Sequence, residues 1–204
     1  MEVVFELQTE QFELQASKLL LTVTDNELQF LTKAEIEKLT SYTANKRKCE
    51  FMSSRVVLKQ MLAQEYSPIR YTEFGKPCLP NAYLGISHSK DYVAIITSKT
   101  KNVSVDIEQY RESVLKIKSK FCNNIEDIEF VTLHDVTILW SAKEVLFKLL
   151  NASVDFKENY SVTKINEKNN CGELQGIVKT KSIEKTIKMS YFYNQFFCIV
   201  WAAE

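Results

Sequence analysis

The chain has 204 residues, 45% of them hydrophobic and 25% charged, which is the composition of an ordinary soluble globular protein. Basic and acidic residues number 26 each, so the formal net charge is zero, and no basic excess indicates binding to nucleic acid or to a membrane surface. Four glycines and three prolines are too few for disorder or a long linker, so the length fits one large domain or two small ones.

Cysteine usage and the N-terminal residues bear on location. The five cysteines are widely scattered without a Cys-x-x-Cys pair, and with only two histidines no zinc-ligand spacing exists. The first residues lack the basic start and apolar run of a signal peptide, and no stretch approaches the ~18 apolar residues of a membrane span. We therefore expect a soluble, cytoplasmic protein with reduced thiols and no membrane partner.

The N-terminal residues predict short strands followed by a short helix. Residues 1–7 and 18–23 alternate or run apolar, as short strands do. Residues 34–39 predict a helix, with Thr32 as its cap and Glu35 as the partner in a capping box.

The middle of the chain predicts one long helix, a loop and two strands. Residues 45–66 carry apolar side chains at helical spacing and end before a Ser-Pro pair. Residues 74–89 hold most of the glycine and proline and predict a loop with turns. Residues 92–97 and 103–108 predict strands, separated by a polar break.

The C-terminal half predicts helices at residues 111–121 and 135–151 and a meander of strands over residues 174–202. Both halves of the chain contain helices and close on an aromatic-led strand rich in β-branched residues. This likeness is compatible with two similar lobes divided near residue 100, but many α+β domains also end on a strand.

The predicted strand at 103–108 carries two carboxylates on one face. Side chains alternate along a strand, so Ser104, Asp106 and Glu108 point one way and the apolar residues between them point the other. The two carboxylates then lie roughly 7 Å apart at their Cα atoms, and Mg²⁺ is usually held by one or two such groups. The spacing by itself favours an ordinary polar face on a half-exposed edge strand.

The predicted helix at 135–151 carries one row of chemically notable side chains beside its apolar stripe. Trp140, Glu144 and Lys148 are spaced by four residues and therefore line up. Glu144 and Lys148 in this order also make a plain ion pair, worth ~0.2–0.5 kcal/mol when exposed. Trp140 alone fits a core position, so the structural interpretation is favoured unless the row meets the acidic strand.

A third cluster lies in the predicted loop. Lys76 stands between a glycine and a proline, which fixes where its ammonium projects. Ser87, His88 and Ser89 offer two hydroxyls and an imidazole that can donate to phosphate, although a histidine in such a setting is more often structural. No nucleophile elbow accompanies the Ser–His pair, so nucleophilic catalysis has little support.

Together these motifs resemble the 4′-phosphopantetheinyl transferase superfamily. The resemblance rests on Phe-Gly-Lys-Pro at 74–77, Ser-His-Ser at 87–89, Val-Asp-Ile-Glu at 105–108 and Trp-Ser-Ala-Lys-Glu-Val-Leu-Phe-Lys at 140–148. Each motif is weak alone, and four in this order are strong. The superfamily transfers phosphopantetheine from coenzyme A to a serine of a carrier protein and releases adenosine 3′,5′-bisphosphate. The chain length is similar to that of its surfactin-synthetase-activating (Sfp-like) class.

The resemblance implies an α+β fold with two similar lobes in one chain, a pseudo-dimer with the active site at the lobe interface. Residues 1–101 would form the lobe with the coenzyme A-binding loops, and residues 102–204 the lobe with the metal and catalytic residues. The partner would be an apo acyl or peptidyl carrier protein, without nucleic acid. Such a chain needs no second copy, so a monomer is compatible with it.

The resemblance also implies residue roles in the second lobe. Asp106, Glu108 and Glu144 would bind Mg²⁺ together with the coenzyme A diphosphate, and Glu144 would also be the base that activates the carrier serine. Lys148 would contact the diphosphate. Because the positive charge is then local, a chain of zero net charge can bind a polyanion.

In the first lobe, the resemblance implies that Ser87 and His88 hold the 3′-phosphate and diphosphate, and that Lys76 lines the adenine side. Three basic residues lie where the family often has cations reaching the 3′-phosphate, and no motif fixes which one matches: Arg47, Lys48 and Arg55. Two positions depart from the family pattern, Ser104 where glycine is usual and Val145 where alanine is common; neither removes a ligand.

Two other functions use the same residues. A different magnesium enzyme, such as a phosphohydrolase or nuclease, would use the carboxylates but would leave the lysine and Ser-His-Ser motifs without a reason. A non-catalytic module that binds coenzyme A or a carrier protein would keep the motifs without turnover. One sequence also does not identify the carrier, which belongs to fatty-acid, polyketide or non-ribosomal peptide synthesis.

Overall fold

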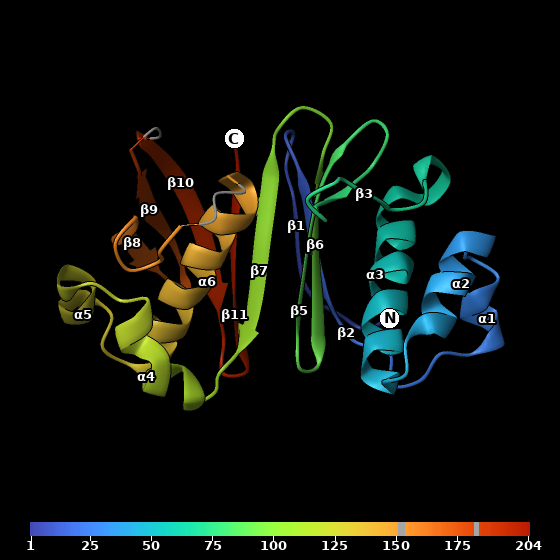
Figure 1. The fold of residues 1–204 in the computed structure, drawn as a ribbon, viewed down its shortest axis with the longest axis horizontal. Helices are drawn as coiled ribbons and strands as arrows, with labels where there is room; N and C mark the ends of the chain where they lie inside the picture. Colours follow the sequence, from blue (N-terminus) through green and yellow to red (C-terminus); the bar gives the residue numbers. More distant parts are fainter. Residues whose placement is uncertain (151–153, 182–183) are drawn as a thin grey trace. The chain divides into compact units, whose positions relative to one another are not determined.

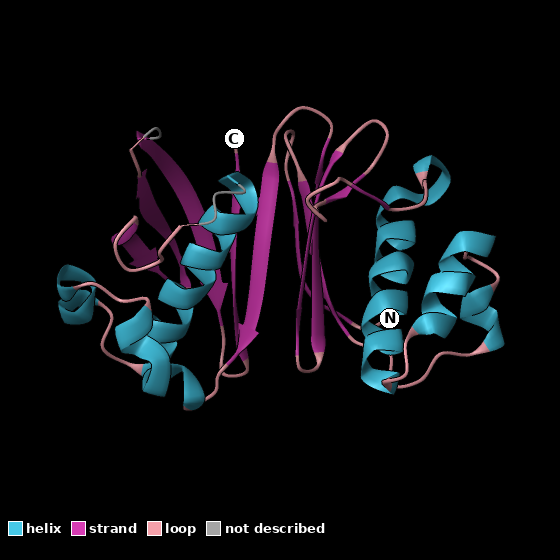
Figure 2. Cartoon of the chain, viewed as in Figure 1, coloured by secondary structure: helices cyan, strands magenta, loops and turns pink. Residues whose placement is uncertain are grey.

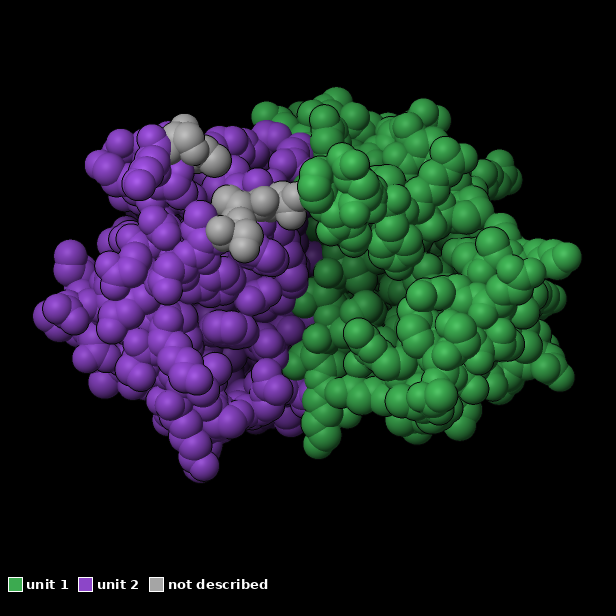
Figure 3. Space-filling view, in the orientation of Figure 1, with its two compact units in different colours: residues 1–101 green, residues 102–204 purple. Residues whose placement is uncertain are grey.

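The computed structural model contains helices and antiparallel sheets, and it describes residues 1–150, 154–181 and 184–204 (Figures 1 and 2). The chain is mixed α+β, as the sequence predicted. Its contacts divide it into two compact units, unit 1 with residues 1–101 and unit 2 with residues 102–204 (Figure 3). None of the described helices has the length and apolar character needed to cross a membrane.

Unit 1 contains a four-stranded antiparallel sheet in the order β1-β2-β6-β5. The strands are β1 (Val3–Gln8), β2 (Glu13–Lys18), β5 (Tyr83–Ser89) and β6 (Tyr92–Ser98). A separate two-stranded hairpin is formed by β3 (Arg70–Tyr71) and β4 (Pro77–Cys78). β5 is therefore an edge strand, and it carries the Ser-His-Ser motif.

The helices of unit 1 are α1 (Asp25–Leu28), α2 (Lys33–Ser41), α3 (Asn45–Leu62) and a 3₁₀ turn (Ala63–Glu65). α3 packs against β6 and β2, where Val57 and Leu58 meet Val93 and Ile95 in a buried cluster. The predicted capping box at the start of α2 is confirmed, because Glu35 N donates to Thr32 and the Glu35 carboxylate accepts from the Thr32 N–H.

Unit 2 contains a five-stranded antiparallel sheet in the order β7-β11-β10-β9-β8. The strands are β7 (Val103–Gln109), β8 (Tyr160–Lys168), β9 (Cys171–Lys179), β10 (Glu184–Tyr193) and β11 (Phe197–Ala203). The predicted C-terminal meander is confirmed by β9, β10 and β11.

The helices of unit 2 are α4 (Ser113–Ile117), a 3₁₀ turn (Lys118–Lys120), α5 (Asn124–Glu129) and α6 (Leu133–Leu150). α6 lies across one face of the sheet and contacts all five strands (Figure 1). Its predicted apolar stripe is buried: Ile138, Leu139, Ala142, Val145, Leu146 and Leu149. The helix that carries the row with Glu144 therefore packs against β7.

Several predicted elements are wrong. Residues 18–23 form no strand beyond Lys18, because Leu19 and Leu20 are covered by packing beside the helices instead of by strand pairing. Residues 74–89 are not one loop: the glycine and proline punctuate only the two turns around β4, and β5 begins at Tyr83. The Ser-His-Ser motif consequently lies on a strand.

Other differences are in extent. The predicted helix at 111–121 is a five-residue α4 followed by a 3₁₀ turn, and the prediction for 45–66 covers α3 and its 3₁₀ extension. Five elements were missed: the short or strongly exposed α1, α5, β3 and β8, and the buried strand β2, which the prediction for 18–23 meets only at Lys18. The predicted end of the long helix at 151 lies outside the described residues, which include α6 up to Leu150.

Candidate functional site

The acidic strand β7 is an edge strand, but its polar face is not half exposed. Asp106 is only 4% exposed and Ser104 is equally buried, because α6 packs over this part of β7. The side chain of Glu108, near the end of the strand, keeps partial contact with solvent. Burying a carboxylate is costly unless a cation or hydrogen-bond donors compensate it, so the partners of Asp106 decide what this face can do.

The partner that compensates Asp106 comes from α6. Lys148 Nζ lies 2.6 Å from Asp106 Oδ1 and 3.4 Å from the Val105 carbonyl oxygen. This contact joins the helix row to the acidic strand. From the spacing of the residues alone these two motifs stayed separate, and an ion pair of Lys148 with Glu144 explained the helix equally well.

Glu144 lies in the same negative field. Burial raises the pKa of its carboxyl group above the ordinary value, and the negative charges of Asp106 and, more weakly, Glu108 raise it further, while Lys148 opposes them. A carboxyl group feels neighbouring charges in this way only at short range in a partly buried setting. The negative charges of Asp106 and Glu108 therefore act on the carboxyl group of Glu144.

The negative charge of Asp106, Glu108 and Glu144 suits a divalent cation, but the positions of their side chains do not form a metal-binding site. Within the described ranges, no three His, Cys, Asp or Glu side chains converge closely enough to form a metal-binding group. Lys148 contacts Asp106, and Arg111 Nη2 lies 3.1 Å from Glu108 Oε2. Asp106, Glu108 and Glu144 carry the carboxylate oxygens that Mg²⁺ prefers, so the chemistry of these donors is suitable although their positions form no metal-binding group.

Ser104 is buried, and Trp140 packs among other aromatic rings. The Ser104 hydroxyl is buried and has no hydrogen-bond partner among the residues that the structure describes. Trp140 belongs to an aromatic cluster, with ring centroids 5.1 Å from Phe121 and 5.8 Å from Phe156. Trp140 thus fills the core side of the helix row, as its apolar character allowed.

A buried ion pair beside the site was not predicted. Lys143 and Glu126 are 0% and 1% exposed at their side chains, and their charged atoms are 2.8 Å apart. Lys143 Nζ also donates to the carbonyl oxygens of Phe121, Phe156 and Tyr160. The available signal was the position of Lys143 on the apolar stripe, four residues after one core leucine and three before another.

In unit 1, His88 and Arg47 both reach Glu50 near the start of α3. His88 Nε2 lies 3.1 Å from the Glu50 carbonyl oxygen, and Arg47 Nη1 lies 2.8 Å from the Glu50 carboxylate. Ser87 precedes His88 on β5 and is buried. The structure therefore brings His88 close to the backbone that carries Arg47 and Lys48, and Lys48 is partly exposed there.

Lys76 follows a tight turn in the β3–β4 hairpin. Gly75 has φ of +77°, which favours glycine, and the turn is closed by backbone bonds between Thr72 and both Gly75 and Lys76. Burial lowers the pKa of the Lys76 ammonium. The ammonium would therefore gain from a neighbouring anion.

Arg55 is held inside unit 1. Its side chain is buried, with Nε 3.2 Å from Glu35 Oε1 and the guanidinium 3.4 Å above the Phe51 ring. It also donates to the Phe51 carbonyl oxygen and to Ser54. Of Arg47, Lys48 and Arg55, Arg55 is thus the residue whose charge is most fully used by contacts within unit 1.

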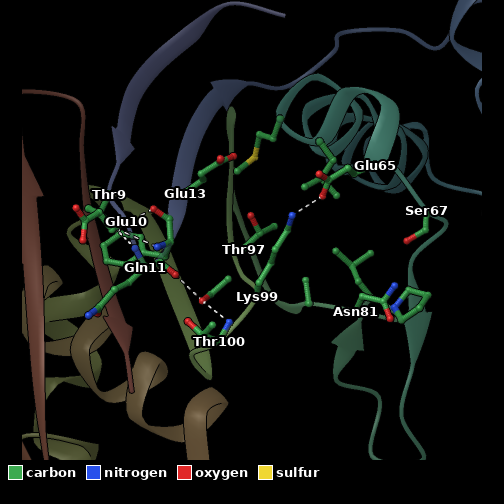
Figure 4. Close-up of a pocket in the computed structure, with 17 residues that line it drawn as sticks. Thr9, Glu10, Gln11, Glu13, Glu65, Ser67, Asn81, Thr97, Lys99 and Thr100 are labelled. Atoms are coloured by element: carbon green, nitrogen blue, oxygen red, sulfur yellow. Dashed lines mark hydrogen bonds and ion pairs between the residues drawn. The ribbon is translucent and has the colours of Figure 1, made fainter.

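A cavity of about 710 Å³ lies elsewhere in unit 1, at the ends of β1, β6 and α3 (Figure 4). Its wall includes Glu10, Glu13 and Glu65, and Lys99 pairs with Glu65 at 2.7 Å. The wall contains none of the basic or Ser-His-Ser residues predicted to bind coenzyme A. Its acidic rim is a poor match for a polyphosphate.

Comparison with known proteins leaves the family open, since no protein-family model and no curated protein matches the sequence. An assignment therefore depends on the residues themselves. The strongest of them are the carboxylates of β7 and the Glu144–Lys148 row of α6, because the ion pair of Lys148 with Asp106 joins two motifs that are distant in sequence.

Proposed function

We propose that the chain is a 4′-phosphopantetheinyl transferase, which moves the phosphopantetheine group of coenzyme A to a serine of an apo carrier protein. The observation that supports it most is the meeting of Asp106, Glu144 and Lys148 in unit 2, with Lys148 Nζ at 2.6 Å from Asp106. Carboxylates that can hold a cation, beside a lysine that can hold a phosphate, suit a diphosphate substrate.

In the proposed reaction the serine hydroxyl of the carrier attacks the β-phosphorus of coenzyme A. The bond from this phosphorus to the bridging oxygen breaks, the phosphopantetheine stays on the serine, and adenosine 3′,5′-bisphosphate leaves with the bridging oxygen. Glu144 accepts the serine proton. Its raised pKa makes it a better base than an ordinary carboxylate, and its partial burial limits competition by water.

Asp106, Glu108 and Glu144 would hold Mg²⁺, which when bound would polarise the phosphoryl oxygens and neutralise the diphosphate. Lys148 binds the diphosphate through its ammonium and stabilises charge as the bond to the leaving group breaks. The side chain of Lys148 is 31% exposed, so its ammonium can reach a substrate while its stem stays packed on α6.

Residues of unit 1 bind the remaining phosphate and the adenine in this proposal. His88 and Ser87 on β5 hold the 3′-phosphate and diphosphate, and Lys76 lines the adenine side. Arg47 and Lys48 are better candidates than Arg55 for the 3′-phosphate, because Arg55 is buried against Glu35. Each unit also combines an antiparallel sheet with one 18-residue helix, which supports the interpretation as two similar lobes.

The test is the intact mass of apo carriers after incubation with the protein, coenzyme A and Mg²⁺. A panel of fatty-acid, polyketide and peptide carriers should include at least one that gains the mass of phosphopantetheine. Glu144→Ala should abolish the gain, whereas Glu158→Ala, an exposed glutamate elsewhere in unit 2, should not. Unchanged transfer by Glu144→Ala, or no gain on any carrier, would contradict the proposal.

The same assay separates the two other functions. A phosphohydrolase would consume coenzyme A without a carrier and leave carrier masses unchanged. A binding module would bind coenzyme A in calorimetry with no more transfer than Glu144→Ala. Excess chelator distinguishes the metal role, since it should stop transfer and Mg²⁺ should restore it. The carrier that gains mass fastest identifies the pathway class.

A further inference from the structure

The cavity of unit 1 lies where helix α3 ends. Val93, Ile95 and Thr97 alternate along β6 and therefore share one face of the sheet. The first two belong to the buried cluster that α3 forms on this face, whereas Thr97 borders the cavity together with Leu62, the last residue of α3. The volume of about 710 Å³ is in the range of small-molecule sites, about 300–1,000 Å³.

Thr97 brings a buried hydroxyl to this cavity. The residue is only 5% exposed, and its neighbours across the sheet are Glu13 on β2 and Leu84 on β5. Within the part of the chain that the structure describes, the side-chain hydroxyl of Thr97 forms no hydrogen bond. A buried polar group without a partner costs free energy, so a hydrogen-bond donor bound in the cavity would offset this cost.

The charges of the cavity favour a cation. Three carboxylates and one ammonium lie on its wall: Glu10, Glu13, Glu65 and Lys99. The hydrogen bond and the charge of Glu65 raise the pKa of Lys99, and the charge of Glu13 adds to this effect. The negative field on this wall therefore acts on a positive group at the rim.

Lys99 shows which kind of cation fits there. Its aliphatic stem extends along the cavity, and its Nζ lies 2.7 Å from Glu65 Oε2 (Figure 4). The two side chains are 71% and 66% exposed, and an exposed pair of this kind is weak. A second ammonium on an apolar stem can therefore be bound beside this pair or in its place.

The rest of the wall is apolar and held in place. Apolar side chains come from the end of α3, from the β1–β2 turn and from the segment after β4: Met61, Leu62, Phe12, Leu79 and Pro80. The β1–β2 turn is fixed to the end of β6, because the Ser98 hydroxyl donates to the Gln11 carbonyl oxygen. The cavity thus offers an apolar surface beside a negative rim, and a matching ligand has an apolar body and a positive group.

We propose that this cavity binds a small organic amine, with its ammonium at Glu13 and Thr97 and its apolar body against the end of α3. An ammonium only donates hydrogen bonds, so the Thr97 hydroxyl oxygen accepts one and the carboxylates neutralise the charge. None of the residues proposed to bind coenzyme A lies on this wall. The amine site therefore does not depend on the proposed function, and either can fail without the other.

The test compares 4-phenylbutylamine with 4-phenylbutyrate, which have the same apolar body and opposite charges. Titrations of ¹⁵N-labelled protein, followed by backbone amide shifts, locate the site and give the affinity. The amine should shift the amides of Leu62, Thr97 and Lys99 and bind about tenfold tighter than the acid or more, because the carboxylates attract one probe and repel the other. Added salt should weaken binding of the amine.

Four variants test the contacts. Glu13→Gln should weaken binding of the amine about twofold to fivefold, and Lys99→Met should tighten it by a similar factor because Glu65 is released. Thr97→Val, which keeps the shape of the side chain, should weaken it about threefold to tenfold. Glu37→Gln, at an exposed glutamate of α2 outside the wall, is the control and should bind like the wild type.

Three results would overturn the amine site. They are equal affinities for the amine and the acid, amide shifts confined to residues outside the cavity, and amine affinities unchanged in both Glu13→Gln and Lys99→Met. The last two variants change partly or fully exposed side chains, so a folding defect in Thr97→Val would leave the test intact.

Discussion

The buried ion pair of Lys143 and Glu126 gives the most quantitative prediction for unit 2. In Lys143→Met the ammonium is removed while the Glu126 carboxylate stays buried at 1% exposure. Removing one partner of such a pair leaves an uncompensated buried charge and typically costs about 3–5 kcal/mol. We expect the free energy of unfolding of unit 2 to fall by that amount.

The surroundings of the pair set the magnitude at that level. Glu126 keeps two backbone donors, from Asn123 and Val162, which hold part of its charge. The loss of the Lys143 ammonium costs more, because Lys143 donates hydrogen bonds to the carbonyl oxygens of Phe121, Phe156 and Tyr160 and so links these segments to α6. Burial lowers the pKa of Lys143, so the ammonium is retained there only through these acceptors.

The assay is urea unfolding followed by tryptophan fluorescence, since Trp140 packs beside this region. Lys179→Met is the control, because Lys179 and Glu184 form a surface pair with both side chains 68% exposed, and its removal should cost under about 1 kcal/mol. The double variant Lys143→Met with Glu126→Gln should lose about 1–3 kcal/mol less than the sum of the single losses. A loss under about 1 kcal/mol for Lys143→Met would refute this account.

Four further changes test other local features. The wild type should lose stability as pH rises above 4.5, because burial first, and neighbouring carboxylates next, make the folded chain hold the proton of Glu144 more tightly than the unfolded chain does. Glu144→Gln should remove this loss. Unfolding free energies of both proteins from about pH 4 to pH 8 test the prediction, and parallel curves would contradict it. Ser104→Ala should be neutral or stabilising by up to about 1 kcal/mol in thermal unfolding, because its buried hydroxyl has no partner among the described residues. Gly172→Ala should cost more than about 1–3 kcal/mol, since a Cβ there would collide with the backbone oxygen of Asn166, and a loss within error would show that the strand adapts. Thr32→Ala should cost about 1 kcal/mol through the lost helix cap, and no change would mean that water replaces the cap.

The secondary structure was predictable wherever the pattern was long and periodic. The 3.6-residue period of α6, the capping box of α2 and the β-branched runs of β6 and β7 all reflect local chemistry that sequence spacing contains. The failures came where tertiary contacts decide. Leu19 and Leu20 look like a strand because they are apolar, yet they are buried beside helices, and β5 looks like a loop because turns flank it on both sides.

The candidate site divides in the same way. Alternation along β7 correctly grouped Asp106 with Glu108, but nothing local could show that Lys148 would reach across from α6 to Asp106. The role of Arg55 was equally hidden, since the buried partner Glu35 lies 20 residues away on another helix. Ion pairs of this kind depend on packing between elements, so the spacing of residues in the sequence can indicate candidate residues but not their partners.

The contrast between Lys143 and Lys148 shows what decides which charged residue is available for chemistry. Both lie on α6 five residues apart, and composition treats them alike. Lys143 is enclosed, and its ammonium is satisfied by one carboxylate and three carbonyl oxygens, so a substrate could take it only by unfolding its surroundings. The side chain of Lys148 is 31% exposed, and its ammonium pairs with the carboxylate of Asp106. Availability for chemistry therefore depends on how enclosed the ammonium is, and by that measure Lys148 is the more available of these two lysines.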